Sequence, residues 1–231
     1  MKRFVCSAVI LLVVLFLSAS AFANSGELLT FQGLGDMQTV GNFYNGSGIP
    51  GTPNYGVSFS SNFFGLSPIM NGGSGNFAPF ANGSGDPHAI FISNSMTGPS
   101  GLPVTGIMNV TAGFSSGLNF FFTAGFAPGQ TETVTVWSGA NGTGTVLATI
   151  NLANNNAGCG APLYCNWSDA SLGFKGTAQS VTFSGPSDEL GLTEITIGSS
   201  TTAVPESSSI YLLGAGLACV SLGKLRRHFS I

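Results

Sequence analysis

Charged residues are scarce in this sequence, at 6% of 231 residues, against about 25% in typical soluble domains. Of the six Lys and Arg residues, only Lys175 lies between residues 24 and 202. The same part of the chain contains eight acidic residues. Proteins that bind nucleic acid neutralise its phosphates with Lys and Arg. The composition therefore excludes nucleic acid as a partner, and 34 glycines indicate a turn-rich chain of extracellular type.

Cysteine is also rare, with four in the chain. Cys6 and Cys219 lie in the apolar segments near the two ends, which leaves Cys159 and Cys165 for the part in between. In an oxidising compartment two cysteines this close predict a local disulfide. Zinc is the alternative, but two thiols need two more ligands and His88 is the only histidine available there.

Catalytic groups in a recognisable arrangement are missing as well. Serine-rich tracts with a single histidine do not make a catalytic triad, and the scattered acids are expected to be solvated charges rather than a glycosidase pair. We therefore expect a protein that is not an enzyme. Calcium stays open as a ligand, because four aspartates are expected in loops, although none has the Asp-x-Asp spacing of a calcium loop; they are Asp36, Asp86, Asp169 and Asp188.

The first residues have the pattern of a secretory signal peptide. Lys2 and Arg3 precede an apolar run over residues 9–17, and Ala21-Phe22-Ala23 supplies the small residues that signal peptidase accepts. The sequence predicts a signal peptide over residues 1–23, cleavage after Ala23 by signal peptidase, and export of the rest.

The last residues predict a transmembrane helix with a cytoplasmic tail. Residues 210–223 are apolar and are followed by Lys224, Arg226 and Arg227. Extended to residues 208–225 the helix measures about 27 Å, close to the bilayer thickness, and the basic flank places the tail in the cytoplasm. A core helix of the domain is the alternative.

A short motif precedes this helix. Val204, Pro205 and Glu206, then the apolar helix and the basic cluster, resemble over residues 203–231 the PEP-CTERM sorting signal of Gram-negative bacteria, with Ser207 where that family has a second proline. The resemblance implies recognition by an exosortase-type membrane protease, cleavage near the motif, and passage from the inner membrane to the cell surface or extracellular polysaccharide. If Ser207 prevents cleavage, the protein remains membrane-anchored.

Residues 24–202 show the period-two alternation of strands and no helical period. Strands are expected at 131–137 and 145–152, joined by a turn over 138–144, and at 55–60, 106–111, 118–123, 179–184 and 190–197. The alternation changes phase around Thr193 and Glu194, which predicts a bulge. Glycine-rich runs within residues 41–105 favour long surface loops. The sequence predicts an all-β body, a β-sandwich of jelly-roll type.

The body also resembles the β-sandwich ectodomains found among PEP-CTERM proteins. The residues that carry the resemblance are 29–34 near the mature start, 133–139, and 190–198 as the closing strand. This resemblance implies the same fold and names no ligand.

Aromatic side chains supply the candidate sugar contacts. Tyr164 and Trp167 flank Cys165 in the predicted disulfide loop and are expected to form an exposed pair. Two functions remain open: a surface or matrix protein associated with extracellular polysaccharide, and a specific carbohydrate-binding module, with or without calcium. Convergence of this pair with two loop acids would favour the binding module, and scatter would favour the structural role.

Overall fold

Alternating apolar residues form strands throughout the described part of the chain. The computed structural model describes residues 26–46, 52–80, 88–94 and 100–198. The predicted signal peptide (1–23), sorting motif, transmembrane helix and basic tail (203–231) lie outside these residues. Within them, no helix is long and apolar enough to cross a membrane.

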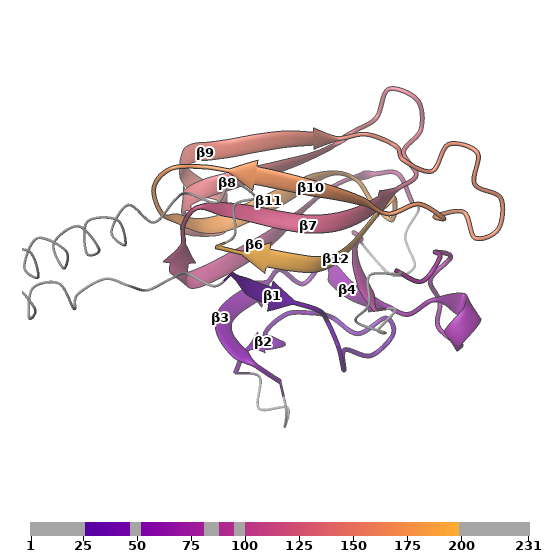
Figure 1. Ribbon diagram of the computed structural model, residues 1–231, viewed down its shortest axis with the longest axis horizontal. Coiled ribbons are helices and arrows are strands. Elements are labelled where there is room, and N and C mark those ends of the chain that lie inside the picture. Colours follow the sequence, from indigo (N-terminus) through magenta and orange to yellow (C-terminus); the bar gives the residue numbers. More distant parts are fainter. Residues whose placement is uncertain (1–25, 47–51, 81–87, 95–99, 199–231) are drawn as a thin grey trace, which may run out of the picture. The chain divides into compact units, whose positions relative to one another are not determined.

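The strands form two sheets of six, and every pair of neighbouring strands is antiparallel (Figure 1). Sheet A has the order β10-β7-β12-β5-β4, and β1 also pairs with β12. Sheet B has the order β2-β3-β6-β11-β8-β9. The bounds are β1 Glu27–Leu29, β2 Tyr44–Asn45, β3 Asn54–Phe59, β4 Phe63–Leu66, β5 Ala89–Ile92, β6 Pro103–Phe114, β7 Gly117–Ala124, β8 Glu132–Gly139, β9 Thr143–Leu152, β10 Ser168–Gly173, β11 Ala178–Pro186 and β12 Leu190–Ile197.

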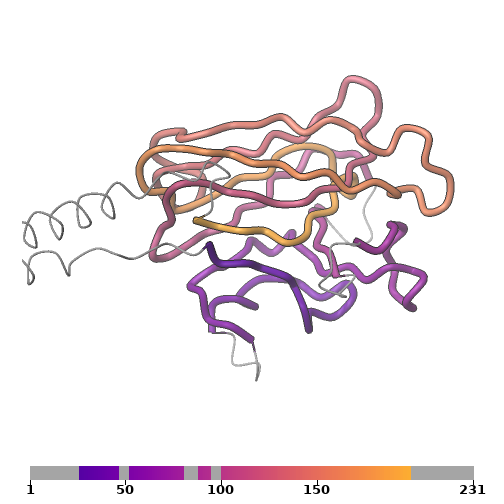
Figure 2. The backbone as a smooth tube through the Cα atoms, in the orientation of Figure 1, coloured from indigo at the N-terminus to yellow at the C-terminus, as the bar shows by residue number. Residues whose placement is uncertain are grey.

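The two sheets pack face to face, as expected for a sandwich. The Phe183 ring of sheet B lies 5.8 Å from the Phe63 ring and 5.9 Å from the Phe120 ring of sheet A, centroid to centroid, in edge-to-face geometry. Such aromatic pairs add to the burial of apolar surface that stabilises the core. The predicted all-β sandwich is therefore confirmed. The first and last strands of the body, β1 and β12, run side by side (Figure 2).

The predicted bulge in the last strand is present. The register of β12 against β7 shifts between Thr193 and Thr196, and Glu194 has a positive φ of 47°. The extra residue changes the phase, so that Leu192 before it and Ile195 after it are both fully buried.

Five strands were not predicted: β1, β2, β4, β5 and β10. β4 and β5 fall inside residues 41–105, where long loops were expected, and β10 follows the disulfide loop. β4 and β5 have only four residues each, too few to show a period. The turn between β8 and β9 is also shorter than predicted and consists of a 3-10 turn, η2, at Ala140–Gly142. Because β9 is an edge strand of sheet B, its Val146 is 47% exposed.

Candidate functional site

A long segment covers part of the outer face of sheet A, and Asp36 holds it in place. This segment, residues 67–80, follows β4 and includes a 3-10 turn, η1, at Ile69–Asn71. The Asp36 carboxylate accepts hydrogen bonds from the Ser67 amide (2.8 Å), the Ser74 amide (3.0 Å) and the Ser74 hydroxyl (2.7 Å). Burial opposes ionisation, but these hydrogen bonds keep the pKa of Asp36 below its usual value.

The disulfide loop lies against the same segment. Cys159 and Cys165 form a disulfide with 5.7 Å between their Cα atoms, which confirms the predicted pair and uses both cysteines of the described residues. The Tyr164 amide donates to the Asn76 carbonyl (3.2 Å), and the Ala78 amide donates to the Tyr164 carbonyl (2.8 Å). This backbone ladder fixes the position of Tyr164 over the sheet.

Trp167 is packed rather than exposed. Its indole N–H donates to the Ala78 carbonyl at 2.8 Å, and its ring makes edge contacts with Phe77 and Phe80, at centroid distances of 5.7 and 5.5 Å. The expected exposed pair is therefore wrong in one respect: the side chains of Tyr164 and Trp167 are both half-buried. Two further aromatic side chains also hold packing positions, since the Tyr44 hydroxyl accepts from the Phe31 amide and the Trp137 indole donates to Thr182.

The Tyr164 hydroxyl meets two acidic residues from the turn between β11 and β12. It lies 2.9 Å from Oε2 of Glu189 and 3.3 Å from the main-chain carbonyl of Asp188. Burial, followed by the nearby negative charges, raises the pKa of Tyr164 well above its usual range, so the hydroxyl stays protonated and donates. The ring packs on Gly125, where an added Cβ would lie 2.8 Å from Cε1 of Tyr164.

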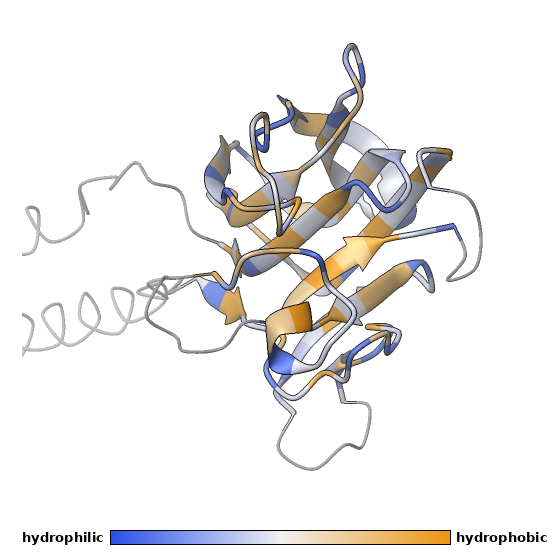
Figure 3. Cartoon of the chain, turned by 90° about the vertical axis from the view of Figure 1, so that its right-hand side faces the viewer, coloured by the Kyte–Doolittle hydropathy of each residue, from blue (hydrophilic) through white to orange (hydrophobic). Residues whose placement is uncertain are grey.

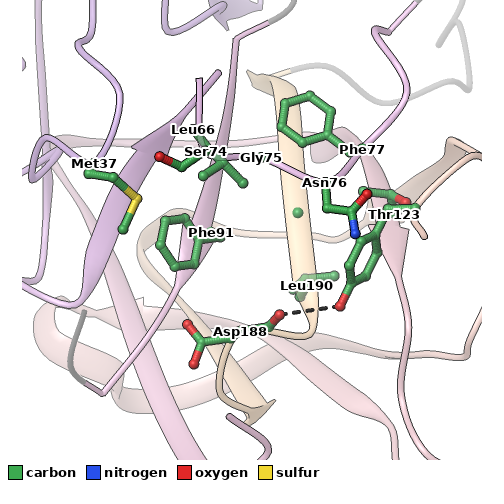
Figure 4. A pocket seen from close by; sticks show the side chains of 12 residues that line it. Met37, Leu66, Ser74, Gly75, Asn76, Phe77, Phe91, Thr123, Asp188 and Leu190 are labelled. Carbon is green, nitrogen blue, oxygen red and sulfur yellow. Dashed lines mark hydrogen bonds between the residues drawn. The ribbon is translucent and has the colours of Figure 1, made fainter. Parts of the chain in front are cut away.

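These elements enclose a pocket of about 260 Å³ over the outer face of sheet A (Figure 4). Apolar and aromatic side chains make most of its wall, with a few hydroxyl, amide and carboxylate groups between them. The lining residues are Met37, Leu66, Ser74, Gly75, Asn76, Phe77, Phe91, Thr123, Tyr164, Asp188, Leu190 and Gly191.

Asp188 is held firmly at the edge of this pocket. Its φ is +66°, a conformation that aspartate tolerates better than most residues. Its amide donates to the Ile92 carbonyl (2.9 Å), its carbonyl accepts from Tyr164, and its Oδ2 accepts from the Ser187 hydroxyl (3.0 Å). The carboxylate therefore has a fixed position next to β5.

Beside the pocket the protein presents exposed apolar side chains. Ile69 and Met70 of η1 are exposed, and η1 faces the viewer in Figure 3 with mostly hydrophobic colour. Leu163, the neighbour of Tyr164, is also exposed.

Three of the four aspartates expected to offer loop oxygens lie in the described residues, and they do not form a metal-binding group. Asp36 anchors residues 67–74, Asp188 lines the pocket, and Asp169 lies in strand β10 rather than in a loop. Asp86 lies outside the described residues. In the part of the chain that the structure describes, no group of three or more His, Cys, Asp or Glu side chains is arranged to hold a metal ion.

One acid that was expected to be solvated is buried in the core instead. Glu132, the first residue of β8, is 1% exposed, and neither of its carboxyl oxygens has a hydrogen-bond partner among the described residues. Burial raises the pKa of Glu132 to about 8.

No protein-family model and no curated protein matches the chain. Among solved structures, the chain is similar to the K2 cleaved adhesin domain of Lys-gingipain, a protein of Porphyromonas gingivalis, with 12% identity, a TM-score of 0.43, and coverage of 77% of this chain and 100% of that one. It is also similar to the carbohydrate-binding module CBM6cm-2 of Cellvibrio mixtus lichenase 5A in complex with cellotriose, with 13% identity, a TM-score of 0.31, and coverage of 52% and 82%. The family 11 carbohydrate-binding module of Clostridium thermocellum gives 8% identity, a TM-score of 0.30, and coverage of 64% and 91%. These scores are too low to carry a functional inference.

Proposed function

We propose that this protein is an exported, non-catalytic β-sandwich protein that binds carbohydrate through the pocket on sheet A. The observation that carries the proposal is the convergence of Tyr164, Asp188 and Phe91 around one cavity. Tyr164 and two acids of the β11–β12 turn come together, and Trp167 packs on the segment that forms the wall. This is the arrangement expected of a binding module rather than of a purely structural protein.

The lining suits a sugar chemically. A sugar ring has apolar C–H faces and hydroxyl groups at its edge, and the pocket offers the Phe91 ring and aliphatic side chains beside Ser74, Asn76 and Asp188. Binding sites of this type combine an apolar wall with a few placed polar groups. At about 260 Å³ the cavity is smaller than the roughly 300–1,000 Å³ of sites for drug-sized ligands, so one sugar unit is the appropriate occupant.

The strand order supports a finer fold assignment. Strands β5-β12-β7-β10 lie in one sheet and β6-β11-β8-β9 in the other. Apart from the β8–β9 hairpin, consecutive strands therefore alternate between the sheets, as in a jelly roll. We propose that the body is a jelly-roll sandwich of this kind.

The sorting route is a separate proposal that rests on the sequence of the two ends. Signal peptidase removes residues 1–23, the C-terminal helix holds the protein in the inner membrane, and an exosortase-type protease cleaves near Pro205 and Glu206 and releases the body to the cell surface or extracellular polysaccharide.

The test of the binding proposal is titration of the purified full chain with a panel of oligosaccharides, with and without calcium. Replacing Phe91 by Ala removes the ring that faces the sugar and is expected to weaken binding about tenfold, equal to about 1.4 kcal/mol. The matched control is Trp137→Ala, which removes an aromatic ring from sheet B and leaves the affinity unchanged. Equal affinities for the wild type and Phe91→Ala would contradict the proposal, and loss of binding in chelator would make calcium part of the site.

A further inference from the structure

We infer that the pocket on sheet A selects a sugar that carries a free, protonated amino group, such as a glucosamine unit, over neutral and acidic sugars. This inference rests on the proposed carbohydrate-binding function and adds the chemical class of the ligand. It is carried by the position of Asp188 and the Phe91 ring in one cavity, whose lining residues include no Lys, Arg or His.

The carboxylate is preorganised for a cationic group. The backbone of Asp188 is bonded on both sides, to the Ile92 carbonyl and to the Tyr164 hydroxyl, and the Ser187 hydroxyl donates to Oδ2. These contacts fix the side chain, and no hydrogen bond among the described residues uses Oδ1, which is therefore the atom offered to a ligand. An ammonium group is the donor that such a carboxylate binds best, because charge-assisted hydrogen bonds are about twice as strong as neutral ones.

The Phe91 ring gives the same preference. Phe91 follows Ile90 on β5 and precedes Ile92, the residue that bonds the Asp188 amide. Figure 4 shows the Asp188 side chain on the same side of the pocket as the Phe91 ring. A cation near the face of an aromatic ring is attracted by the negative charge density of that face. A protonated amine at this point would therefore interact with the carboxylate and the ring together.

Glu189 does not compete for the ligand. Its Oε2 accepts the Tyr164 hydroxyl at 2.9 Å, so this carboxylate is used to hold the wall of the pocket. Asp188 is the acidic residue that lines the cavity. Glu189 therefore holds the wall in place, and we expect the charge of Asp188 to set the preference for an amino sugar.

Positive charge that could attract an acidic sugar lies far away. Among residues 26–198 the only Lys or Arg is Lys175, which lies two residues beyond the end of β10. At the other end of β10, Trp167 directly precedes the strand and packs on Phe77 of the pocket wall. A six-residue strand measures about 20 Å, well beyond the screening length of about 8 Å at physiological salt. Burial also lowers the pKa of His88, against the effect of nearby Asp36, so this histidine is mostly neutral at neutral pH. Uronic acids and sulfated sugars therefore meet only negative charge.

The experiment compares oligomers of glucosamine, N-acetylglucosamine and a uronic acid of equal length by calorimetric titration of the full chain, at a pH where the free amine is protonated. We expect glucosamine oligomers to bind about tenfold more tightly than acetylated ones, as for loss of one charge-assisted hydrogen bond. Asp188→Asn keeps the shape and tolerates the positive φ, and should abolish this preference while binding of acetylated oligomers persists.

The matched control is Glu27→Gln, which removes one exposed negative charge opposite Ile197, at the end of β12 about 20 Å from the pocket. It should keep the full preference. If no oligosaccharide binds to the wild type, the proposed function itself fails. If acetylated or acidic oligomers bind as tightly as glucosamine oligomers, or if Asp188→Asn retains the preference, carbohydrate binding stands and the amino-sugar inference is overturned.

Discussion

At the scale of single residues, Glu132 is the most unusual side chain in the body. It points into the sandwich on the same side of β8 as the fully buried Val134 and Val136. Its side chain lies against Gly185 of β11, where an added Cβ would collide with it. A carboxyl group in such surroundings is stable only when protonated, because an unpaired charge in the core costs several kcal/mol.

This residue predicts an unusual pH dependence of stability. The pKa in the folded state is about 8, against 4.5 for the free side chain, so the folded state retains a proton that the unfolded state has lost. The stabilisation is fully present below pH 4.5 and is lost as the pH rises through about 8. Thermal unfolding of the wild type should show a melting temperature that falls as the pH rises across this range. The fall corresponds to a loss of a few kcal/mol in the free energy of unfolding.

Replacing Glu132 by Gln tests the cause, because glutamine has nearly the same shape and does not ionise. The variant is expected to lose most of the decline in melting temperature and to be the more stable protein at the alkaline end. Glu27→Gln, at an exposed position, should behave as the wild type. A wild-type melting temperature that is flat over this range, or a decline as steep in Glu132→Gln, would show that Glu132 is not the titrating group.

At the scale of elements, the disulfide loop and residues 67–80 act together as the wall of the pocket. The Cys159–Cys165 disulfide closes the loop, and the main chain of Tyr164 is bonded to Asn76 and Ala78. Tyr164 in turn reaches the β11–β12 turn through its hydroxyl. Tyr164 therefore links residues 67–80 to the β11–β12 turn, and opening the disulfide loop should affect binding as well as stability.

Replacing both cysteines by serine tests this coupling. A loop this short is expected to contribute about 2 kcal/mol through chain entropy, and the freed Tyr164 should lower the affinity for an oligosaccharide severalfold. Unfolding in denaturant measures the loss of stability, and the oligosaccharide titration measures the loss of affinity. Reduction of the disulfide in the wild type should reproduce both losses. A variant that loses stability but binds with unchanged affinity would show that the loop does not position the site.

Long strands could be predicted from the sequence more accurately than short ones. Long alternating runs, such as those of β8 and β11, were predicted close to their observed bounds, and the phase change in β12 predicted its bulge. The pocket could be predicted only in part. Tyr164 and Asp188 were candidates by residue type, but Phe91 lies in a four-residue strand without a visible period. The cavity joins segments from residue 37 to residue 191, and pairing over such distances is set by tertiary packing, which no local pattern records.

Trp167 and Glu132 were expected to be exposed to solvent, and this expectation was wrong for a related reason. Trp167 is covered by Phe77 and Phe80, which belong to a glycine-rich stretch that seemed to be a surface loop. Glu132 begins a predicted strand whose inward face carries the buried Val134 and Val136, but an acid on such a face contradicts the usual pattern. In both cases residue type suggested exposure and the packing of distant segments decided otherwise.

At the scale of the whole molecule, the two ends predict a processing route that the body does not reveal. We expect the mature protein to begin at Asn24 and to end near Pro205 and Glu206. Intact-mass measurement and cell fractionation, in hosts with and without an exosortase-type protease, would test this. The body should leave the inner membrane only when the protease is present, and a full-length tail in both hosts would mean that Ser207 prevents cleavage and the protein stays anchored.

The central claim is that the pocket over sheet A holds a sugar, and its most direct test is to map backbone amide shifts by NMR while an oligosaccharide is added. The account predicts the largest changes at Phe91, Tyr164, Asp188 and Gly191, which come from three separate segments and line this cavity together. Changes confined to the outer face of sheet B, or saturable binding that leaves these four amides unshifted, would contradict it.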